Sequence, residues 1–275
     1  MNPRLGVVIV THNHERTIGD VLRSILDQTC PPAATVVVDC GSQQRDWMND
    51  WTRRPDLVVV DAGWNLGFSG GNNEGLRRLS PGIDLVLFLN PDVLMPRDLL
   101  ERVLAFSVSA RAGGLAAWSV RLLGWDFGAR APTGTVDSTG IFPYWNGWRD
   151  RRLGSPPASD AVEEVPALCG AFFMARREAL QAVALPNGQI WDERYVAHKE
   201  DVELSLRLRK SGKRIAVWHG AEAWHGRGWP ADRSSVPRAL RLMAARNEVR
   251  LHADYAWHKF PMSVLKWMAV RWLDL

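Results

Sequence analysis

The sequence predicts an α/β protein with a Rossmann-like, doubly wound and mostly parallel sheet, followed by a C-terminal helical extension. Three observations support this prediction. Short β-rich runs alternate with helical patterns through the first half of the chain, a rhythm typical of parallel sheets with helices on both faces. The runs are apolar throughout rather than alternating with polar residues, as in strands covered on both sides. Each run also ends in polar residues, at the sheet edge where such folds bind ligands.

The first half contains four predicted strands. They are residues 5–10, 35–39, 57–61 and 85–89. A helix is predicted over 17–28, because Ile18, Val21 and Ile25 recur on one face of a helical period. Shorter helices are predicted over 74–79 and 97–109. The stretch NLGFSGGNNEG at 65–75 is predicted to be a loop, since its four glycines disfavour the middle of a helix.

The second half has a less regular pattern. Residues 113–165 are rich in Gly, Trp, Pro and Arg, and we expect irregular strands and loops there. Residues 165–176 are strand-like. Residues 200–211 alternate as a strand would, but acids open the segment and Gly212 follows it, which favours a helix. A last helix is predicted over 236–251.

The chain is expected to form one domain at 1–232 with a helical appendage. The predicted divisions are a first half at 1–112, a second half at 113–232, and a helical segment at 233–275. The last segment combines three tryptophans with Lys259, Lys266 and Arg271, a pattern that suits shallow binding to an anionic membrane surface. A helix packed on the catalytic domain or on a second subunit explains the pattern equally well.

Composition limits the classes of function. The 275 residues are 46% hydrophobic and 23% charged, which is typical of a folded globular protein. A net charge of +4 favours anionic partners, but no basic run with interleaved aromatics indicates nucleic acid binding. The three cysteines form no CxxC pair and are predicted to be reduced thiols. With no signal peptide and no apolar stretch of ~18 residues, a cytoplasmic location is predicted, with peripheral membrane contact as an option.

Three short segments carry candidate catalytic side chains. Asn90-Pro91-Asp92 follows the fourth strand and can present a carboxylate to a divalent cation, although NPD is also an ordinary turn. Glu200 and Asp201 open the predicted helix at 200–211, where acids also serve as helix caps. His225 follows a strand-like run. Sugar transfer from a nucleotide diphosphate needs a cation for the leaving diphosphate and a base for the acceptor hydroxyl, and these segments offer one candidate for each.

The order and spacing of the motifs resemble a known family. They are VVIVTHNHERTIGDVLRSILDQT, VVVDCGSQ, NLGFSGGNNEG, LVLFLNPDV, VDSTG, CGAFFMARREAL, WDERYVAHKEDVELSLRLRKSGKRI, HGRG and RNEVRLH. Together they resemble the inverting nucleotide-diphospho-sugar glycosyltransferases of GT-A family 2, and within it the bacterial dTDP-rhamnosyltransferases. The resemblance covers most of the chain and implies a GT-A fold. It also implies that 1–232 is a catalytic domain, with a nucleotide-binding half at 1–112 and an acceptor and catalytic half at 113–232. The irregular region at 113–165 is then expected to carry acceptor specificity.

The resemblance implies roles for matching residues. The implied nucleotide-sugar contacts are Thr11, Asn13, Glu15, Asp39, Asn65, Gly67, Phe68, Gly71, Asn72, Asn90 and Asp92. In the 65–75 stretch, glycines would let the backbone approach the ligand while amides donate hydrogen bonds. Asp201 is the implied general base. The implied acceptor contacts are Cys169, Gly170, Trp191 and Glu200.

The resemblance also implies a metal site. Asn90 replaces the first acid of the family's DxD motif, which leaves Asp92 as the firm carboxylate ligand. His225 matches the histidine that completes the site, and either Mg²⁺ or Mn²⁺ is compatible with this pair.

The resulting prediction is a metal-dependent inverting transferase that moves L-rhamnose from dTDP-rhamnose to a hydroxyl of a cell-envelope glycan, which a lipid could carry. A galactofuranosyl- or other hexosyltransferase is the alternative within the class. A sugar nucleotidyltransferase would need glycines in the loop after the first strand, and VTHNHERT lacks them. A dinucleotide-dependent oxidoreductase would need GxGxxG there, which is also absent. A non-catalytic sugar-binding relative stays open.

Overall fold

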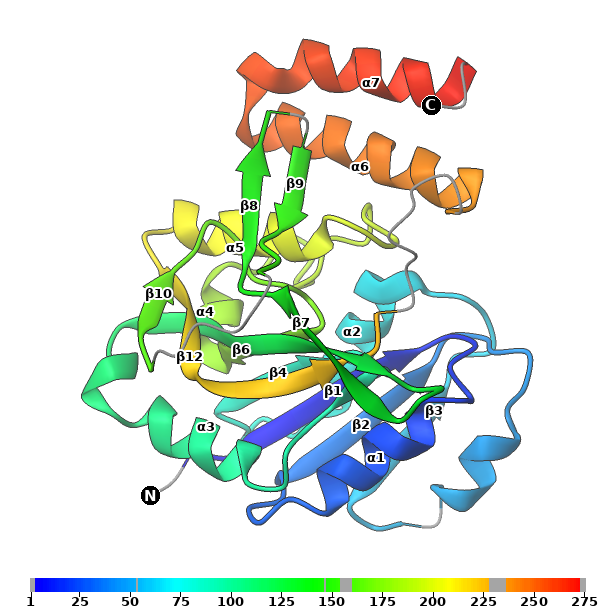
Figure 1. Cartoon of the computed structure of the whole chain (residues 1–275), viewed down its shortest axis with the longest axis vertical. Helices are drawn as coiled ribbons and strands as arrows, with labels where there is room; N and C mark the ends of the chain where they lie inside the picture. Colours follow the sequence, from blue (N-terminus) through cyan, green and yellow to red (C-terminus); the bar gives the residue numbers. More distant parts are fainter. Residues whose placement is uncertain (1–2, 53, 146, 154–159, 228–235, 273–275) are drawn as a thin grey trace.

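The computed structural model describes residues 3–52, 54–145, 147–153, 160–227 and 236–272 (Figure 1). Its core is a mixed ten-stranded sheet, of which eight strands follow the order β10-β12-β6-β11-β4-β1-β2-β3, while β5 pairs with β12 and β7 with β6. The first four strands are β1 (Leu5–Thr11), β2 (Ala34–Asp39), β3 (Leu57–Asp61) and β4 (Leu85–Leu89). They run parallel, in the order β4-β1-β2-β3. This confirms the four strands predicted from the apolar runs.

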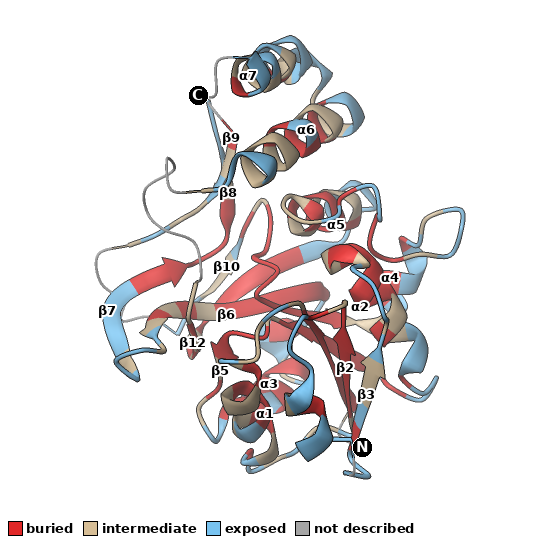
Figure 2. Cartoon of the chain, turned by 90° about the vertical axis from the view of Figure 1, so that its right-hand side faces the viewer, coloured by how far each residue is buried: buried red, intermediate tan, exposed pale blue. Residues whose placement is uncertain are grey.

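Helices cover both faces of the sheet, as the apolar strands require. One face is covered by α1 (Ile18–Leu26) and α3 (Leu99–Ser107), and the other by α2 (Gly67–Arg78), α4 (Arg177–Ala182) and α5 (Glu200–Lys210). Successive side chains of a strand point to opposite faces. In β1, Val7 and Ile9 therefore pack in the core beneath α1 and α3, while Val8 packs with the second group. Figure 2 shows the buried sheet between these two layers.

The glycine-rich stretch is the main correction to the predicted elements. It is the body of α2 and not a loop. A Cβ on Gly71 would lie 2.6 Å from Val10 Cγ1, and one on Gly75 would lie 2.3 Å from Val8 Cγ1. The glycines therefore let the helix backbone lie directly on β1, and this close packing outweighs their poor helix propensity. Asn65 caps the start of the helix region by accepting a hydrogen bond from Gly67 N–H.

The region 113–165, predicted to hold irregular strands and loops, contains regular strands. They are β6 (Leu115–Asp126), β7 (Ala131–Ser138) and β10 (Val162–Glu164), with a separate hairpin of β8 (Ile141–Tyr144) and β9 (Gly147–Asp150). The sheet is completed by β5 (Val93–Leu94), β11 (Phe172–Arg176) and β12 (Arg214–His225). Within predicted segment 165–176 only β11 is a strand. The antiparallel strand β11 joins β4 to β6, so it connects the two halves in one sheet. Short 3-10 helices occur at Asp46–Asp50, Ala110–Ala112 and Trp257–Lys259.

Two C-terminal helices, α6 (Arg238–Tyr255) and α7 (Phe260–Trp272), lie beside the β8–β9 hairpin and above α5 (Figure 1). The predicted helix at 236–251 is thus confirmed and longer. Helix α6 packs on the catalytic domain: Asn247 Nδ2 donates to the Ala197 and His198 carbonyls at 2.8 and 2.9 Å. The predicted division at 232/233 lies outside the described residues. None of the helices in the described ranges combines the length and hydropathy that crossing a bilayer requires.

Candidate active site

The ends of β1 and β2 form one connected polar edge. Thr11 and Asp39 are paired in register as the last residues of these strands. The Asp39 carboxylate accepts hydrogen bonds from Ser42 N–H at 2.9 Å and Ser42 Oγ at 2.5 Å. Ser42 Oγ also accepts from Asn13 N–H at 2.8 Å, and Asn13 adopts a left-handed φ of 59°. The hydrogen bond from Asn13 to Ser42 therefore fixes the conformation of the loop after β1 against the loop after β2, and the Asn13 side chain is exposed.

The Asn90–Asp92 turn is fixed from both sides. Thr17 Oγ1, just before α1, donates to the Pro91 carbonyl at 2.6 Å. Gly226 N–H, just after β12, donates to the Asp92 carbonyl at 2.8 Å. The turn thus joins the end of β4 to the end of β12, and this brings the carboxylate of Asp92 to His225.

His225 lies between two carboxylates. Its Nε2 is 3.4 Å from Asp92 Oδ1, and its Nδ1 is 2.7 Å from Asp137 Oδ2 at the end of β7. A hydrogen bond from Nδ1–H to Asp137 leaves Nε2 facing Asp92, where a bound cation would replace the Nε2 proton. This is the arrangement in which a carboxylate orients a metal-binding imidazole. Asp92 and His225, predicted to share one cation, are therefore brought together, and Asp137 is the partner that sequence reasoning missed.

The charges around His225 also favour a cation. Burial lowers the pKa of His225, but Asp92 and Asp137 outweigh it and raise the pKa to about 9. The same negative field that retains a proton on the imidazole would attract a divalent ion beside it. Asp92 is only 8% exposed, so solvent screens this field weakly.

A chain of ion pairs runs from this pair toward Asp201. Asp137 Oδ1 lies 2.8 Å from Arg227 Nε, and Arg227 Nη2 donates to Asp150 Oδ2 at 2.7 Å. Asp150 is close enough for its charge to raise the pKa of Asp201, after the larger effect of burial. Asp137 lies in the VDSTG motif and Arg227 in the HGRG motif. Both motifs contributed to the family resemblance, but no role was predicted for these two residues.

Asp201 is the second residue of α5 and faces the strand-end loop at 169–170. Gly170 N–H donates to its Oδ2 at 3.0 Å, and Val202 N–H donates to its Oδ1 at 2.8 Å. Burial raises the pKa of Asp201. Burial, followed by the Asp201 charge, raises the pKa of Glu200 well above its usual range. Two adjacent carboxyl groups with raised pKa therefore open α5, and two backbone amides orient one of them, Asp201.

The backbone before Asp201 is strained. His198 and Lys199 both have left-handed φ angles, 69° and 73°, which non-glycine residues rarely adopt. The hydrogen bonds from Asn247 hold this turn, and Lys199 Nζ donates to the Trp148 carbonyl at 2.7 Å. Such strain persists where surrounding contacts impose it, commonly at functional sites. No sequence pattern predicted it, because both the turn and its supports come from distant segments.

Several buried oxygens at these positions have no hydrogen-bond partner within the described residues. They are Thr11 Oγ1, Glu15 Oε2, Asn90 Oδ1, Asp92 Oδ1, Asp150 Oδ1 and Glu200 Oε2. Buried polar atoms are nearly always paired in folded proteins. A ligand could supply partners for these oxygens, and Asp92 with His225 gives a donor set that fits a divalent cation.

Some predicted contacts are corrected. Trp191 is fully buried and packs edge to face on Phe68, Phe88 and Phe173, so it supports the site and cannot stack on an acceptor. Gly71 and Asn72 are buried within α2, and Asn72 Nδ2 donates to the Phe68 carbonyl, so both have packing roles.

The remaining residues differ in exposure. Phe68 is half-buried and lies beside Gly170, Asn65 is exposed, and Gly67 contacts Val196. Cys169 is buried next to Gly170, and burial raises the pKa of its thiol well above its usual value. All three cysteines are free, as predicted. Their ligand contacts stay predictions.

With this geometry in place, comparison with known proteins is informative. Residues 6–184 match the sequence profile described as Glycosyl transferase family 2. The chain belongs to this family. The match covers more than half of the chain and includes the ends of β1, β2 and β4, so the resemblance inferred from the motifs is confirmed.

Curated relatives are similar at low identity. The low-salt glycan biosynthesis hexosyltransferase Agl10 of Haloferax volcanii is 23% identical over 86% of this chain and 71% of its own length. An N-acetylglucosaminyl-diphospho-decaprenol L-rhamnosyltransferase of Mycobacterium tuberculosis is 27% identical over 82% of this chain and 76% of its own length. Family and relatives together identify the chain as a glycosyltransferase.

Solved structures confirm the GT-A fold. GalNAc-T7, crystallised with UDP, GalNAc and Mn²⁺, superposes with a TM-score of 0.67 at 16% identity over 95% of this chain, which spans about half the length (51%) of that protein. Residues 1–349 of TarS from S. aureus, crystallised with UDP-GlcNAc, superpose with a TM-score of 0.56 at 18% identity, over 98% of this chain and 73% of that one.

Proposed function

We propose that this family 2 glycosyltransferase is metal-dependent and inverting, with the cation held by Asp92 and His225 and with Asp201 as the general base. The observation that carries the proposal is the pairing of His225 Nε2 with Asp92 at 3.4 Å while Asp137 holds Nδ1. The partnerless buried oxygens along the same edge support a donor site there.

The residues present fit either Mg²⁺ or Mn²⁺. One carboxylate and one imidazole leave most of a cation's coordination shell for phosphate oxygens and water, as is usual when such ions bind nucleotides. When bound, the ion would neutralise the charge that develops on the leaving diphosphate. Asp137 would keep the imidazole in the right tautomer, and Arg227 would keep Asp137 in place.

Asp201 performs the proton transfer. As the acceptor oxygen attacks the anomeric carbon, a new carbon–oxygen bond forms and the bond to the diphosphate breaks on the opposite face, so the anomeric centre inverts. The acceptor proton passes to the Asp201 carboxylate, a contribution of roughly 10²–10⁴-fold. The Gly170 amide directs the carboxylate, and the raised pKa of Asp201 makes it a stronger base than an exposed aspartate.

For the donor we propose dTDP-rhamnose, and for the acceptor a hydroxyl of a cell-envelope glycan on a lipid diphosphate. The support is the named activity of the Mycobacterium tuberculosis relative. Transfer of another hexose is the second candidate, favoured by the hexosyltransferase from Haloferax volcanii and by neighbours crystallised with UDP-sugars.

We also propose a peripheral position on the cytoplasmic face of the membrane. The support lies in α7, where Met262, Leu265, Met268 and Trp272 are spaced on one helical face and are 36–75% exposed. An apolar row of this kind beside Lys259 and Arg271 suits the interface of an anionic bilayer.

A thermal-shift panel of dTDP, UDP and GDP, each with Mn²⁺, Mg²⁺ or EDTA, tests the proposal. A ligand that binds only the folded state raises the melting temperature. We expect the largest shift with dTDP plus a divalent cation, and loss of the cation-dependent part in His225→Ala. Stabilisation by GDP alone would refute the dTDP donor. Shifts that EDTA and His225→Ala leave unchanged would refute the metal site.

A further inference from the structure

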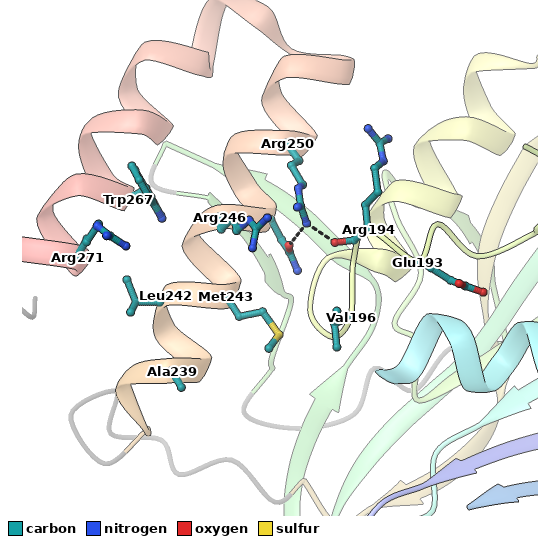
Figure 3. A pocket seen from close by; sticks show the side chains of 11 residues that line it. Glu193, Arg194, Val196, Ala239, Leu242, Met243, Arg246, Arg250, Trp267 and Arg271 are labelled. Carbon is teal, nitrogen blue, oxygen red and sulfur yellow. Dashed lines mark hydrogen bonds between the residues drawn. The ribbon is translucent and has the colours of Figure 1, made fainter. Parts of the chain in front are cut away.

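A second cavity lies outside the Asp92–His225 site. It is a cleft of about 690 Å³ between α6, α7 and the loop at 193–196 (Figure 3). We call it the arginine cleft. Its lining residues are Glu193, Arg194, Val196, Ala239, Leu242, Met243, Arg246, Asn247, Arg250, Trp267 and Arg271. The volume is ample for a small amphiphile.

The cleft carries an excess of positive charge. Arg194 is balanced by Asp192 and Asp254, at 2.7 and 3.0 Å. Among the described residues, Arg250 donates to neutral acceptors, the Arg194 carbonyl and Asn247 Oδ1, and burial and the nearby Arg246 lower its pKa. Crowding of like charges costs stability, and an anion between them would relieve it.

Two further arginines are available to a ligand. Arg246 is exposed, and its guanidinium contacts no carboxylate within the described ranges. The Arg271 guanidinium lies over the rings of Trp267 and Trp272, at 5.6 and 5.4 Å from their centres. Its five donors are not used by a carboxylate among the described residues. Arginine binds phosphate oxygens through paired N–H donors, so this set suits phosphate.

The remaining walls of the cleft are apolar. Leu242 on α6 lies on the side of Trp267 on α7, and Met243 points toward Val196 on the loop (Figure 3). Free phosphate would make no favourable contact with these apolar walls. A ligand with an anionic head and a hydrocarbon chain would contact the arginines through the head and the apolar walls through the chain. The exposed apolar row on α7 (Met262, Leu265, Met268 and Trp272) belongs to the helix that forms one wall, and it offers such a chain a route to a bilayer.

The cleft is connected to the proposed catalytic base. Val196 accepts a hydrogen bond from Phe68 N–H at 2.7 Å, and Phe68 lies beside Gly170. Asn247, which lines the cleft, holds the strained turn that leads into Asp201. The cleft and the proposed base Asp201 are thus linked through the loop at 193–196 and through Asn247.

We propose that the arginine cleft binds the diphosphate of the acceptor lipid, with the first part of its hydrocarbon chain against Leu242, Met243 and Trp267. This inference rests on the proposed function. It assigns α6 and α7 the task of recognising the carrier, while the strand ends recognise the donor. The cleft binds the diphosphate through arginines and needs no cation.

Binding of farnesyl diphosphate, measured calorimetrically in EDTA, tests the assignment on the whole chain. EDTA suppresses cation-dependent binding of diphosphate at Asp92 and His225. We expect the double variant Arg246→Gln/Arg271→Gln to bind farnesyl diphosphate about tenfold more weakly or worse, because the diphosphate loses its charge-assisted hydrogen bonds to both guanidinium groups. Arg209→Gln, an exposed arginine at the end of α5 that does not line the cleft, should bind like the wild type.

The alternatives give distinct results. Equal affinity of the double variant and the wild type would overturn the proposal. Inorganic pyrophosphate that binds as tightly as farnesyl diphosphate would reduce the cleft to a free-phosphate site and overturn the lipid assignment. Variant-sensitive binding to phosphatidylglycerol vesicles that farnesyl diphosphate does not displace would assign the cleft to membrane headgroups instead.

Failure of the inference is separable from failure of the proposed function. The double variant should keep the dTDP-dependent thermal shift with Mn²⁺, because no residue of the donor edge is changed. If the wild type shows no such shift, the proposed function fails, while binding in EDTA still reports on the cleft.

Discussion

The two halves of the catalytic domain are built in different ways. In the nucleotide-binding half, strands β1 to β4 are joined by helices, and the buried positions of these strands are mostly apolar. The principal polar contact of Asp39 is with Ser42, three residues away. In the catalytic half, His225 meets Asp137, 88 residues away, and Lys199 meets Trp148, 51 residues away. One half follows local pattern, and the other is assembled from distant segments.

The halves also differ in what burial costs. Burying Val7 or Ile9 stabilises the fold, whereas burying Asp137 and Glu200 costs free energy unless partners compensate. The catalytic half thus holds charged groups and two left-handed residues, His198 and Lys199, in place at a cost to stability. We therefore expect substitutions in the catalytic half to change chemistry and those in the nucleotide-binding half to change folding.

The largest effect is expected for Asp201→Asn. The amide cannot accept the acceptor proton, so kcat should fall by about 10²–10⁴-fold, while dTDP affinity should stay within about twofold of wild type. Steady-state kinetics and nucleotide titration measure the two quantities. Asp56→Asn, an exposed aspartate before β3, is the matched control in the other half and should transfer normally. Unchanged turnover in Asp201→Asn would refute the assignment of Asp201 as the base. It would also contradict the expectation that substitutions in the catalytic half change the chemistry.

A smaller effect is expected for Asp137→Asn. Without the carboxylate that holds His225 Nδ1, affinity for Mn²⁺ should fall by roughly 10–100-fold. The apparent activation constant for Mn²⁺ and direct metal titration both report it, and saturating Mn²⁺ should restore much of the turnover. If Mn²⁺ affinity does not change, Asp137 supports only Arg227 and has no part in metal binding.

The pH dependence of kcat/KM sharpens the role of burial. Since burial raises the pKa of Asp201 above 3.8, its protonated, inactive form persists to higher pH than for an exposed aspartate. The rate should fall as pH drops through this raised pKa, with about a tenfold loss per unit below it. Circular dichroism at each pH checks that the chain stays folded. An acid limb centred at or below 3.8 would contradict the desolvated environment.

Gly75→Ala should have the smallest effect on transfer and a clear effect on folding. The new Cβ would lie 2.3 Å from Val8 Cγ1, so the free energy of unfolding should fall by about 1–3 kcal/mol with kcat unchanged. Gly19→Ala in α1 is the matched control. Its Cβ would be at least 3.6 Å from its neighbours, so stability should stay level or rise by up to about 1 kcal/mol. Chemical denaturation measures both, and equal stability of the two variants would refute helix–strand packing as the reason for Gly75.

The same contrast explains which predictions succeeded. The strand and helix patterns at 5–10, 17–28 and 85–89 predicted real elements, because apolar periodicity reflects which face is buried. The prediction of a loop at 65–75 was wrong for an energetic reason. Each glycine in a helix costs about 1 kcal/mol relative to alanine, but the close packing of α2 on β1 stabilises the helix by more than this cost. Trp191 misled because a tryptophan near a site can serve the core as well as a sugar.

By itself, the sequence determined the parallel core, the polar strand ends, the family and the candidates Asp92, Asp201 and His225. Only the tertiary structure decided that Asp137 orients His225, that Asn247 holds the turn before Asp201, and that arginines of α6 and α7 share a cleft. The physical reason is the sequence separation over which each interaction acts. Hydrophobic periodicity and helix capping depend on residues a few positions apart, whereas a buried charge or a strained turn is stabilised by a distant segment that the fold places against it.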